Sequence, residues 1–166
     1  REGRTVDKVQ LLQQLSEVRP AERLCRDYQI EHGHPMTSEQ FKERIHYRGP
    51  DHPQKGTIRV TPENAYISRS DDIALNKHPF YIPCDIHAHD FFEVVYVYRG
   101  SFDQYLDGRD IRMQPGDLCI LSPGVPHLLK VFDESIAINL LIRRSTFHEA
   151  FFSLLKGKDV FADFFS

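Results

Sequence analysis

Hydrophobic residues follow a helical spacing at the beginning of the chain. Apolar side chains recur every three or four positions over residues 6–18 and again over residues 20–32, as in amphipathic helices. A capping box from Thr37 to Gln40 predicts a short third helix. The pattern ends in a loop rich in Gly and Pro, so we expect a helical segment over residues 1–56.

The spacing changes to that of short β-strands between residues 57 and 142. Residues 91–98 are almost all aromatic or β-branched, which is typical of a strand buried on both faces. The dipeptide Asp107-Gly108 between two alternating stretches predicts a hairpin. Turn residues recur about every 8–12 positions, which indicates a β-sandwich or a barrel. The other strands are expected at residues 57–61, 65–68, 118–121, 128–132 and 136–142.

The tail, residues 143–166, is rich in Phe and Leu at helical spacing, and Gly157 divides it into two predicted helices. We therefore expect three parts: the helical segment 1–56, a barrel over residues 57–142, and this tail. Because the chain begins with Arg1 rather than Met, we expect it to be a piece of a longer protein.

Composition and charge exclude several classes of protein. The chain has 21 basic and 24 acidic residues, so it lacks the strongly basic balance of a free-standing nucleic-acid binder. No apolar run approaches the roughly 18–20 residues that span a bilayer. The three cysteines are widely spaced and form no CxxC motif, so we expect reduced thiols and a cytoplasmic protein.

One short stretch combines residues that bind metals. His87, His89 and Glu93 are separated by even numbers of residues, so on a strand their side chains point to one face. A fourth ligand would come from a facing strand, where His127 follows a Pro-Gly turn. Imidazole nitrogen and carboxylate oxygen suit Fe, Mn, Ni or Zn. The spacing therefore predicts a candidate divalent-metal site.

The same residues carry a resemblance to a known family. The HxHxxxE spacing from His87 to Glu93, with Gly100 after it, resembles the first motif of the cupin superfamily. Residues 116–127 resemble most of the second motif. The departures from the two motifs are Tyr81 in place of a glycine, a proline at 123 instead of 122, and Val131 in place of an asparagine.

The residue pattern around and between these motifs, over residues 57–166, resembles the N-terminal effector domain of AraC-type transcription regulators. The resemblance implies a mainly β fold, a cupin double-stranded β-helix or jelly-roll barrel, with N-terminal helices and a C-terminal helical tail. It also implies a small-molecule effector such as a sugar, a homodimer and no enzymatic activity. DNA would be contacted only through a helix-turn-helix domain absent from this chain, and no membrane would be involved.

The four polar residues of the candidate site allow two interpretations. They either bind a divalent metal or persist as a hydrogen-bonded polar network, because a His–Glu–His cluster can satisfy its own buried polar groups. In both cases they would anchor the polar groups of an effector. We expect Phe91, Val95 and Tyr105 to form apolar walls of that effector site.

The strand at residues 91–98 also has an opposite face. Its side chains are expected to pack under helices or at a subunit contact; they belong to Phe92, Val94, Tyr96 and Tyr98. Cys84 and Cys119 are expected to be small core residues. The histidines outside the candidate site, among them His78, are expected at helix ends or in surface loops.

Two other functions remain open. A metal-dependent cupin oxygenase or isomerase would use the same four residues to hold Fe or Mn with open positions. The full set of four ligands favours this enzyme, whereas the departures at Tyr81 and Val131 favour the regulator. A sugar-binding storage cupin has only the fold in its favour.

Overall fold

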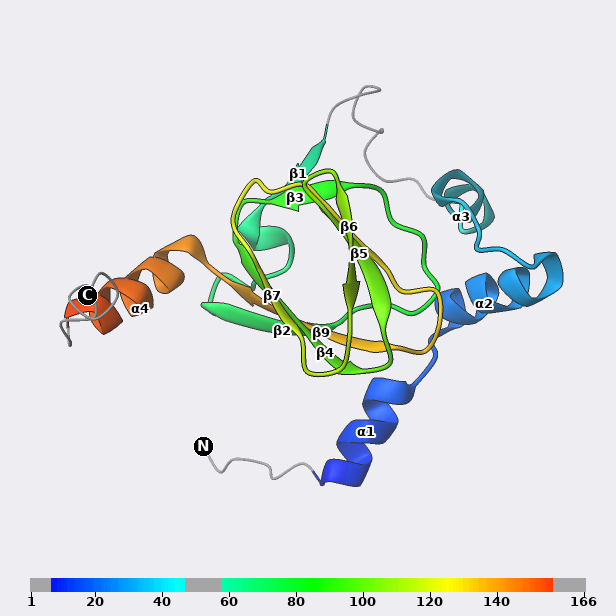
Figure 1. The fold of residues 1–166 in the computed structure, drawn as a ribbon, viewed down its shortest axis with the longest axis horizontal. Helices are drawn as coiled ribbons and strands as arrows, with labels where there is room; N and C mark the ends of the chain where they lie inside the picture. Colours follow the sequence, from blue (N-terminus) through cyan, green and yellow to red (C-terminus); the bar gives the residue numbers. More distant parts are fainter. Residues whose placement is uncertain (1–6, 47–57, 157–166) are drawn as a thin grey trace.

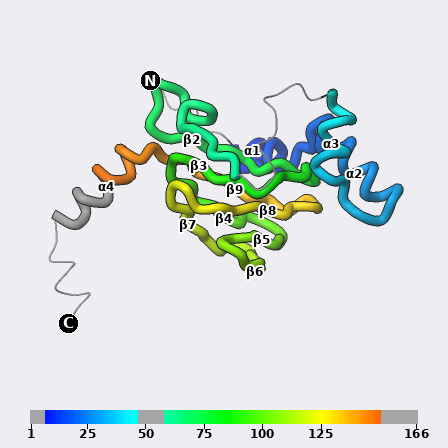
Figure 2. The backbone as a smooth tube through the Cα atoms, turned by 90° about the horizontal axis from the view of Figure 1, so that it is seen from above, coloured from blue at the N-terminus to red at the C-terminus, as the bar shows by residue number. Residues whose placement is uncertain are grey.

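The computed structural model describes residues 7–46 and 58–156. A barrel of two β-sheets lies at its centre, three helices precede the barrel, and a fourth helix leaves it on another side (Figures 1 and 2). The helices are α1 (Lys8–Ser16), α2 (Pro20–His32), α3 (Ser38–Arg44) and α4 (Arg144–Lys156). The three predicted N-terminal helices are therefore confirmed, while the second predicted tail helix, after Gly157, lies outside the described residues.

The strands form two sheets that face each other. One sheet has the order β1-β3-β8-β5-β6 and the other has the order β2-β9-β4-β7. Successive strands of the chain mostly belong to different sheets. Two packed sheets connected in this way form the jelly-roll barrel of the cupin fold, as expected. The bounds are β1 (Arg59–Thr61), β2 (Ile73–Lys77), β3 (His87–His89), β4 (Phe92–Arg99), β5 (Phe102–Leu106), β6 (Arg109–Met113), β7 (Leu118–Leu121), β8 (His127–Lys130) and β9 (Ile136–Ile142).

The sequence pattern gave a wrong prediction at residues 65–68 and no clear prediction at β2. The predicted strand at residues 65–68 is wrong, because the chain there forms a 3-10 turn, η1 (Glu63–Ala65), after Pro62. The N–H of Ile67 donates to the carbonyl of Glu63 at 2.9 Å, so the backbone curls and buries Ile67 in a small core. The edge strand β2 had no clear signal, because its alternation is weak.

Strand β4 sits in the middle of its sheet and fixes the register of the barrel. Val95 on β4 lies opposite Cys119 on β7 and Asn139 on β9. Alternate side chains of β4 point inward, and Val95 and Val97 are fully buried. They pack in a core with residues of both sheets and of the loop after β2, including Phe80, Phe102, Met113, Leu129 and Val131.

The turn between β4 and β5 requires a residue without a side chain. Gly100 has φ +74°, and a Cβ there would overlap the side chain and backbone of Ser135. The Ser135 Oγ in turn accepts the N–H of Ser101 at 3.0 Å. The glycine that closes the first motif is thus explained by a close approach to the turn before β9.

A buried carboxylate attaches the N-terminal helices to the barrel. Glu22 on α2 is fully buried, and its Oε1 accepts the N–H of Phe80 at 2.9 Å. The same oxygen lies 3.4 Å from Nζ of Lys77, whose side chain is also buried. Oε2 accepts the N–H of Arg19 at the start of α2. One residue therefore joins the first turn of a helix to the end of β2.

We predict that Glu22→Leu lowers the free energy of unfolding by about 3–5 kcal/mol, because Lys77 is left buried without its counter-charge. Urea unfolding measures the change. Glu31→Leu, at an exposed position near the end of the same helix, should change it by less than about 0.5 kcal/mol. Adding Lys77→Met to Glu22→Leu should restore part of the loss. A loss below about 1 kcal/mol for Glu22→Leu would contradict this role.

Candidate functional site

The four residues of the predicted site converge inside one end of the barrel. His87 and His89 lie on β3, and His127 lies directly opposite His87 on the neighbouring strand β8. The ring centroids of the three histidines lie 4.6–5.0 Å apart. One ligand atom from each histidine lies within 4.8 Å of the others. His87 and His89 share one face of β3 as predicted, whereas His127 lies beside them in the same sheet and not on a facing strand.

Glu93 enters this cluster from the opposite sheet, so the prediction that it shares one strand face with His87 and His89 is wrong. It lies on β4, is 3% exposed, and places Oε2 3.2 Å from Nδ1 of His89 and 3.2 Å from Nε2 of His127. This oxygen is buried and has no partner in hydrogen-bonding geometry among the described residues. A buried carboxylate oxygen between two imidazoles is thus available to a ligand.

Backbone carbonyls hold two of the rings in place. Nδ1 of His87 lies 2.9 Å from the carbonyl of Asp85, and Nδ1 of His127 lies 2.9 Å from the carbonyl of Val125. When Nδ1 donates to the carbonyl, Nε2 of the same ring carries a free lone pair. Metal-binding histidines are commonly oriented by this kind of contact.

The charge state of the cluster at neutral pH also suits a cation. Burial lowers the pKa of His89 to about 4 and lowers that of His87, so both rings are neutral. Burial by itself would raise the pKa of Glu93, but the adjacent ring of His127 and the charge that His89 can carry lower it. The site therefore combines an ionised carboxylate with neutral imidazoles. No deprotonation of Glu93, His87 or His89 is needed before a metal binds.

The donor set fits a divalent metal. Three imidazoles and one carboxylate are available, two of the imidazoles are oriented by the backbone, and the carboxylate oxygen has no hydrogen bond. Such nitrogen and oxygen ligands suit Fe, Mn, Ni or Zn. Bound there, a metal would act as a Lewis acid toward an oxygen or nitrogen of a ligand.

Two of the three residues that were predicted to form apolar walls of the effector site lie on the inner face of the barrel. Phe91 and Val95 are buried, and the ring of Phe91 stacks on His89 with centroids 4.5 Å apart. Tyr105 lies opposite Leu128 on the outer face of β5, because Gln104 beside it points inward. The prediction that Tyr105 lines the interior is therefore wrong.

An inner polar layer next to the cluster was missed from the sequence. Gln104 is fully buried, and its Nε2 lies 3.8 Å from Sγ of Cys119. The Oε1 of Gln104 and the Oδ1 of Asn139 are buried without hydrogen-bond partners among the described residues. Gln104 lies two residues before Leu106, which pairs with His127. This even spacing was the sequence signal that could have placed Gln104 on the inner face.

His78 is also placed differently from the prediction. It follows β2, its N–H donates to the carbonyl of Ala137 at 2.9 Å, and its side chain is buried. The buried Nε2 atom has no hydrogen-bond partner in the described part of the chain. Burial, the largest effect, lowers the pKa of His78 to about 4. His78 is therefore a neutral interior residue, not a surface histidine.

Comparison with known proteins agrees with this architecture. Residues 83–142 match the family model described as the AraC-like ligand binding domain. The match contains all four residues of the cluster. Residues 83–142 are therefore similar to AraC-like ligand binding domains. This AraC-like segment runs from the loop before β3 to the end of β9.

Several solved structures are similar to part of this chain. KdgF from Halomonas sp. is 25% identical with a TM-score of 0.33, and the match covers 43% of this chain and 59% of that chain. An RmlC-like cupin from Shewanella frigidimarina is 24% identical with a TM-score of 0.38, covering 43% and 67%. The DMSP lyase DddQ from Ruegeria pomeroyi is 22% identical with a TM-score of 0.37, covering 43% and 38%.

The likeness to these proteins is partial. The match covers less than two thirds of the length of KdgF and of DddQ. No curated protein gave a significant match to the chain. Within residues 7–46 and 58–156, no helix has the length and hydropathy needed to cross a membrane.

We predict that acid destabilises the fold partly through His78. The unfolded chain takes up a proton at His78 near pH 6.5, whereas the folded chain does so only near pH 4. Stability should therefore fall as pH falls from about 6.5 to 4. The charged and titratable groups around this ring are Glu93, His87, His127 and Glu22.

The measurement is the free energy of unfolding in urea across this pH range. His78→Phe should reduce its slope by up to about 1.4 kcal/mol per pH unit. His34→Phe, which replaces an exposed histidine in the loop after α2, should leave the slope unchanged. An equal slope in the wild type and His78→Phe would contradict the prediction.

Proposed function

We propose that this chain is the sensor part of an AraC-type transcription regulator. Its barrel binds a small-molecule effector, such as a sugar, beside the cluster of His87, His89, Glu93 and His127. The bound effector biases two states of a helix-turn-helix DNA-binding domain that is carried outside this chain. The protein acts in the cytoplasm as a homodimer and is not an enzyme.

One observation carries the proposal. A three-histidine cluster with a buried carboxylate lies inside the stretch that matches the AraC-like ligand binding domain. The nearby oxygens of Gln104 and Asn139 are buried acceptors without partners among the described residues. Buried acceptors of this kind are costly unless something donates to them. Hydroxyl or amino groups of an effector supply such donors.

The second candidate function is a metal-dependent cupin enzyme, such as an oxygenase or isomerase. The three histidines and Glu93 favour it, because a metal held by these residues with an open position could also bind a substrate. In both functions the four residues orient the bound molecule, in the sensor either directly or through a metal ion. A sensor releases the molecule unchanged, whereas an enzyme converts it into a product.

We predict that chelator-treated protein binds one divalent ion per chain from among Fe, Mn, Ni and Zn. His87→Ala and His127→Ala should each weaken binding at least about tenfold, since each removes a ligand. Isothermal titration and elemental analysis measure the affinity and the ratio. His34→Ala, away from the barrel interior, serves as the control. Unchanged affinity in His127→Ala would instead favour the hydrogen-bonded polar network.

We also predict that a panel of sugars and related polar metabolites contains a ligand that raises the thermal midpoint. At a ligand concentration of about 100 times Kd, binding adds about 2.7 kcal/mol to stability. Gln104→Leu should abolish the shift, because the amide that meets the ligand is lost. Tyr105→Phe, on the outer face of the same strand, should preserve it.

Recovery of the ligand distinguishes the two functions. Mass spectrometry after incubation with metal-loaded protein should return the ligand unchanged if the barrel is a sensor. Conversion of the ligand, or consumption of oxygen with it, would favour the enzyme. A panel without any stabilising ligand would count against the proposed sensor.

A further inference from the structure

A cation lies in the same row of paired residues as the histidine cluster. Arg59 on the edge strand β1 pairs with His87 on β3, and His87 pairs with His127 on β8 (Figure 1). Paired residues on neighbouring strands point to the same face of a sheet, so Arg59 shares the inner face with the two histidines. Thr61, two residues later, pairs with His89 and is buried, which agrees with this orientation of β1.

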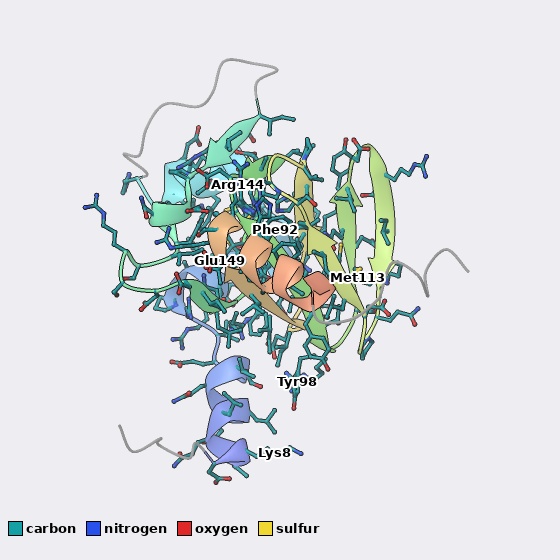
Figure 3. The ribbon with its side chains drawn as sticks, turned by 90° about the vertical axis from the view of Figure 1, so that its left-hand side faces the viewer. Lys8, Phe92, Tyr98, Met113, Arg144 and Glu149 are labelled. Carbon is teal, nitrogen blue, oxygen red and sulfur yellow. The ribbon has the colours of Figure 1, made fainter. Side chains whose placement is uncertain are left out.

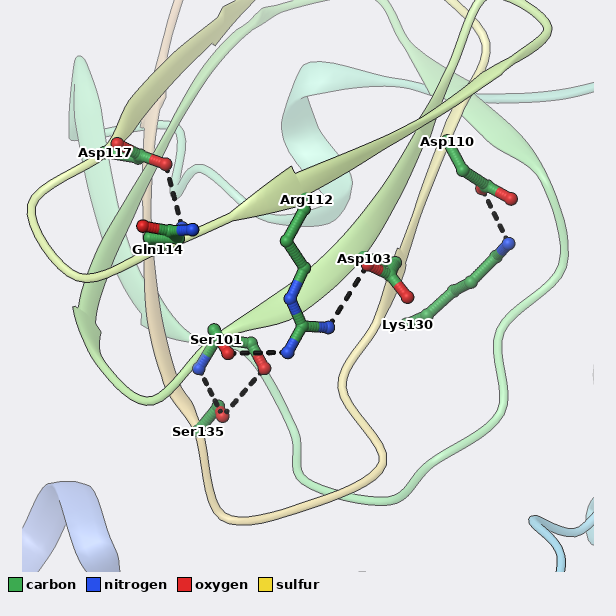
Figure 4. A network of polar contacts seen from close by, with 8 residues as sticks. All are labelled: Ser101, Asp103, Asp110, Arg112, Gln114, Asp117, Lys130 and Ser135. Carbon is green, nitrogen blue, oxygen red and sulfur yellow. Dashed lines mark hydrogen bonds and ion pairs between the residues drawn. The ribbon is translucent and has the colours of Figure 1, made fainter.

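The charge of Arg59 has no counter-charge. Arg59 is exposed, and its side chain forms no ion pair or hydrogen bond among the described residues. Two other cations of the same sheet are paired with acids on its outer face (Figure 4). Arg112 lies 3.1 Å from Asp103, and Lys130 lies 2.6 Å from Asp110. Arg59 therefore differs from both in its face and in its unpaired charge.

Other cations around this end of the barrel are held elsewhere. Arg143 follows β9, and its Nη1 lies 2.9 Å from Oε2 of Glu63. The next residue, Arg144, begins helix α4 outside the barrel (Figure 3). Lys42 on α3 places Nζ 2.6 Å from Oδ2 of Asp85. None of these three positions shares a strand row with the histidines.

Arg59 is also the nearer of the two cations in its row. Arg109 on β6 ends the row on the other side, where it pairs with Leu106, the partner of His127. Because strands lie about 4.8 Å apart, Arg109 is about 10 Å from the nearest histidine backbone, and Arg59 is about 5 Å away. Burial is the main cause of the lowered pKa of His87, and the charge of Arg59 lowers it further.

We propose that Arg59 binds a carboxylate of the effector, so that the ligand is a polyhydroxy acid, such as an acidic sugar, rather than a neutral sugar. This inference rests on the proposed function, because it names the class of molecule that the barrel binds. A guanidinium forms two parallel hydrogen bonds with a carboxylate. Hydroxyl groups of the same molecule would donate to the buried oxygens of Gln104 and Asn139.

The charges around the cluster agree with an acidic ligand. A divalent ion held beside the carboxylate of Glu93 leaves one positive charge, and Arg59 adds another. A neutral sugar would leave both charges without a partner, whereas a carboxylate neutralises one of them. A phosphate dianion would need a second cation, and the described residues place no second unpaired cation on β1, β3 or β8.

The test is isothermal titration of the 166-residue chain with matched pairs of a neutral sugar and its uronic acid, such as glucose with glucuronate and galactose with galacturonate. At least one uronate should bind about tenfold more tightly than its neutral sugar. Arg59→Gln should weaken binding of that uronate about tenfold and change binding of the neutral sugar less than about twofold, because only the carboxylate loses its partner.

Two further variants sharpen the comparison. Arg112→Gln removes an arginine from the outer face of the same sheet, so it should leave both affinities unchanged. Arg59→Lys keeps the charge without the paired hydrogen bonds, so it should lose part of the affinity for the uronate. Thermal unfolding checks that each variant is folded, and Arg59→Lys remains informative if Arg59→Gln does not fold.

The outcomes separate this inference from the proposed function. Equal affinity for the two members of every pair, or a folded Arg59→Gln variant that binds the uronate like the wild type, would overturn the inference and leave the sensor standing. Tighter binding of the sugar 6-phosphate would overturn the carboxylate. Conversion of a uronate whose binding needs Arg59 would overturn the sensor alone. Binding of no member of any pair would overturn both.

Discussion

The placement of Glu93 between His89 and His127 is the constraint on which the barrel end depends. Each oxygen–nitrogen distance is 3.2 Å, so the two sheets must approach at a fixed separation and register. The carboxylate is buried, and burying an ionised group is unfavourable unless polar partners or a cation lie close by. The rest of the site follows from this arrangement, because it brings a carboxylate close to the imidazoles of both strands.

The same strand that supplies Glu93 divides the molecule into an inside and an outside. Val95 and Val97 continue its inner face into the core, while Val94 and Tyr96 lie on the outer face of the sheet. A shift of one residue in register would exchange the two sets of side chains. The candidate site and the outer face of this sheet are therefore coupled through the alternation of β4.

A second buried carboxylate, that of Glu22 on α2, fixes the position of the N-terminal helices in a comparable way. Glu22 accepts backbone N–H groups from α2 and from Phe80, and it neutralises Lys77. The N-terminal helices are thus positioned by polar contacts with the end of β2 as well as by apolar packing of Leu15 and Val18 against the core. The two buried acids fix the helices and the site independently.

The motif resemblance indicated the cupin fold, and the sequence by itself determined the order of helices and most strands and the face shared by His87 and His89. These features depend on local periodicity, turn residues and strand alternation, which one segment contains on its own. Only the tertiary structure decided that His78 is buried, that Gln104 replaces Tyr105 on the inner face, and that the strand expected at residues 65–68 curls. Those outcomes depend on which strands pair and in which register, and pairing joins residues that are distant along the chain.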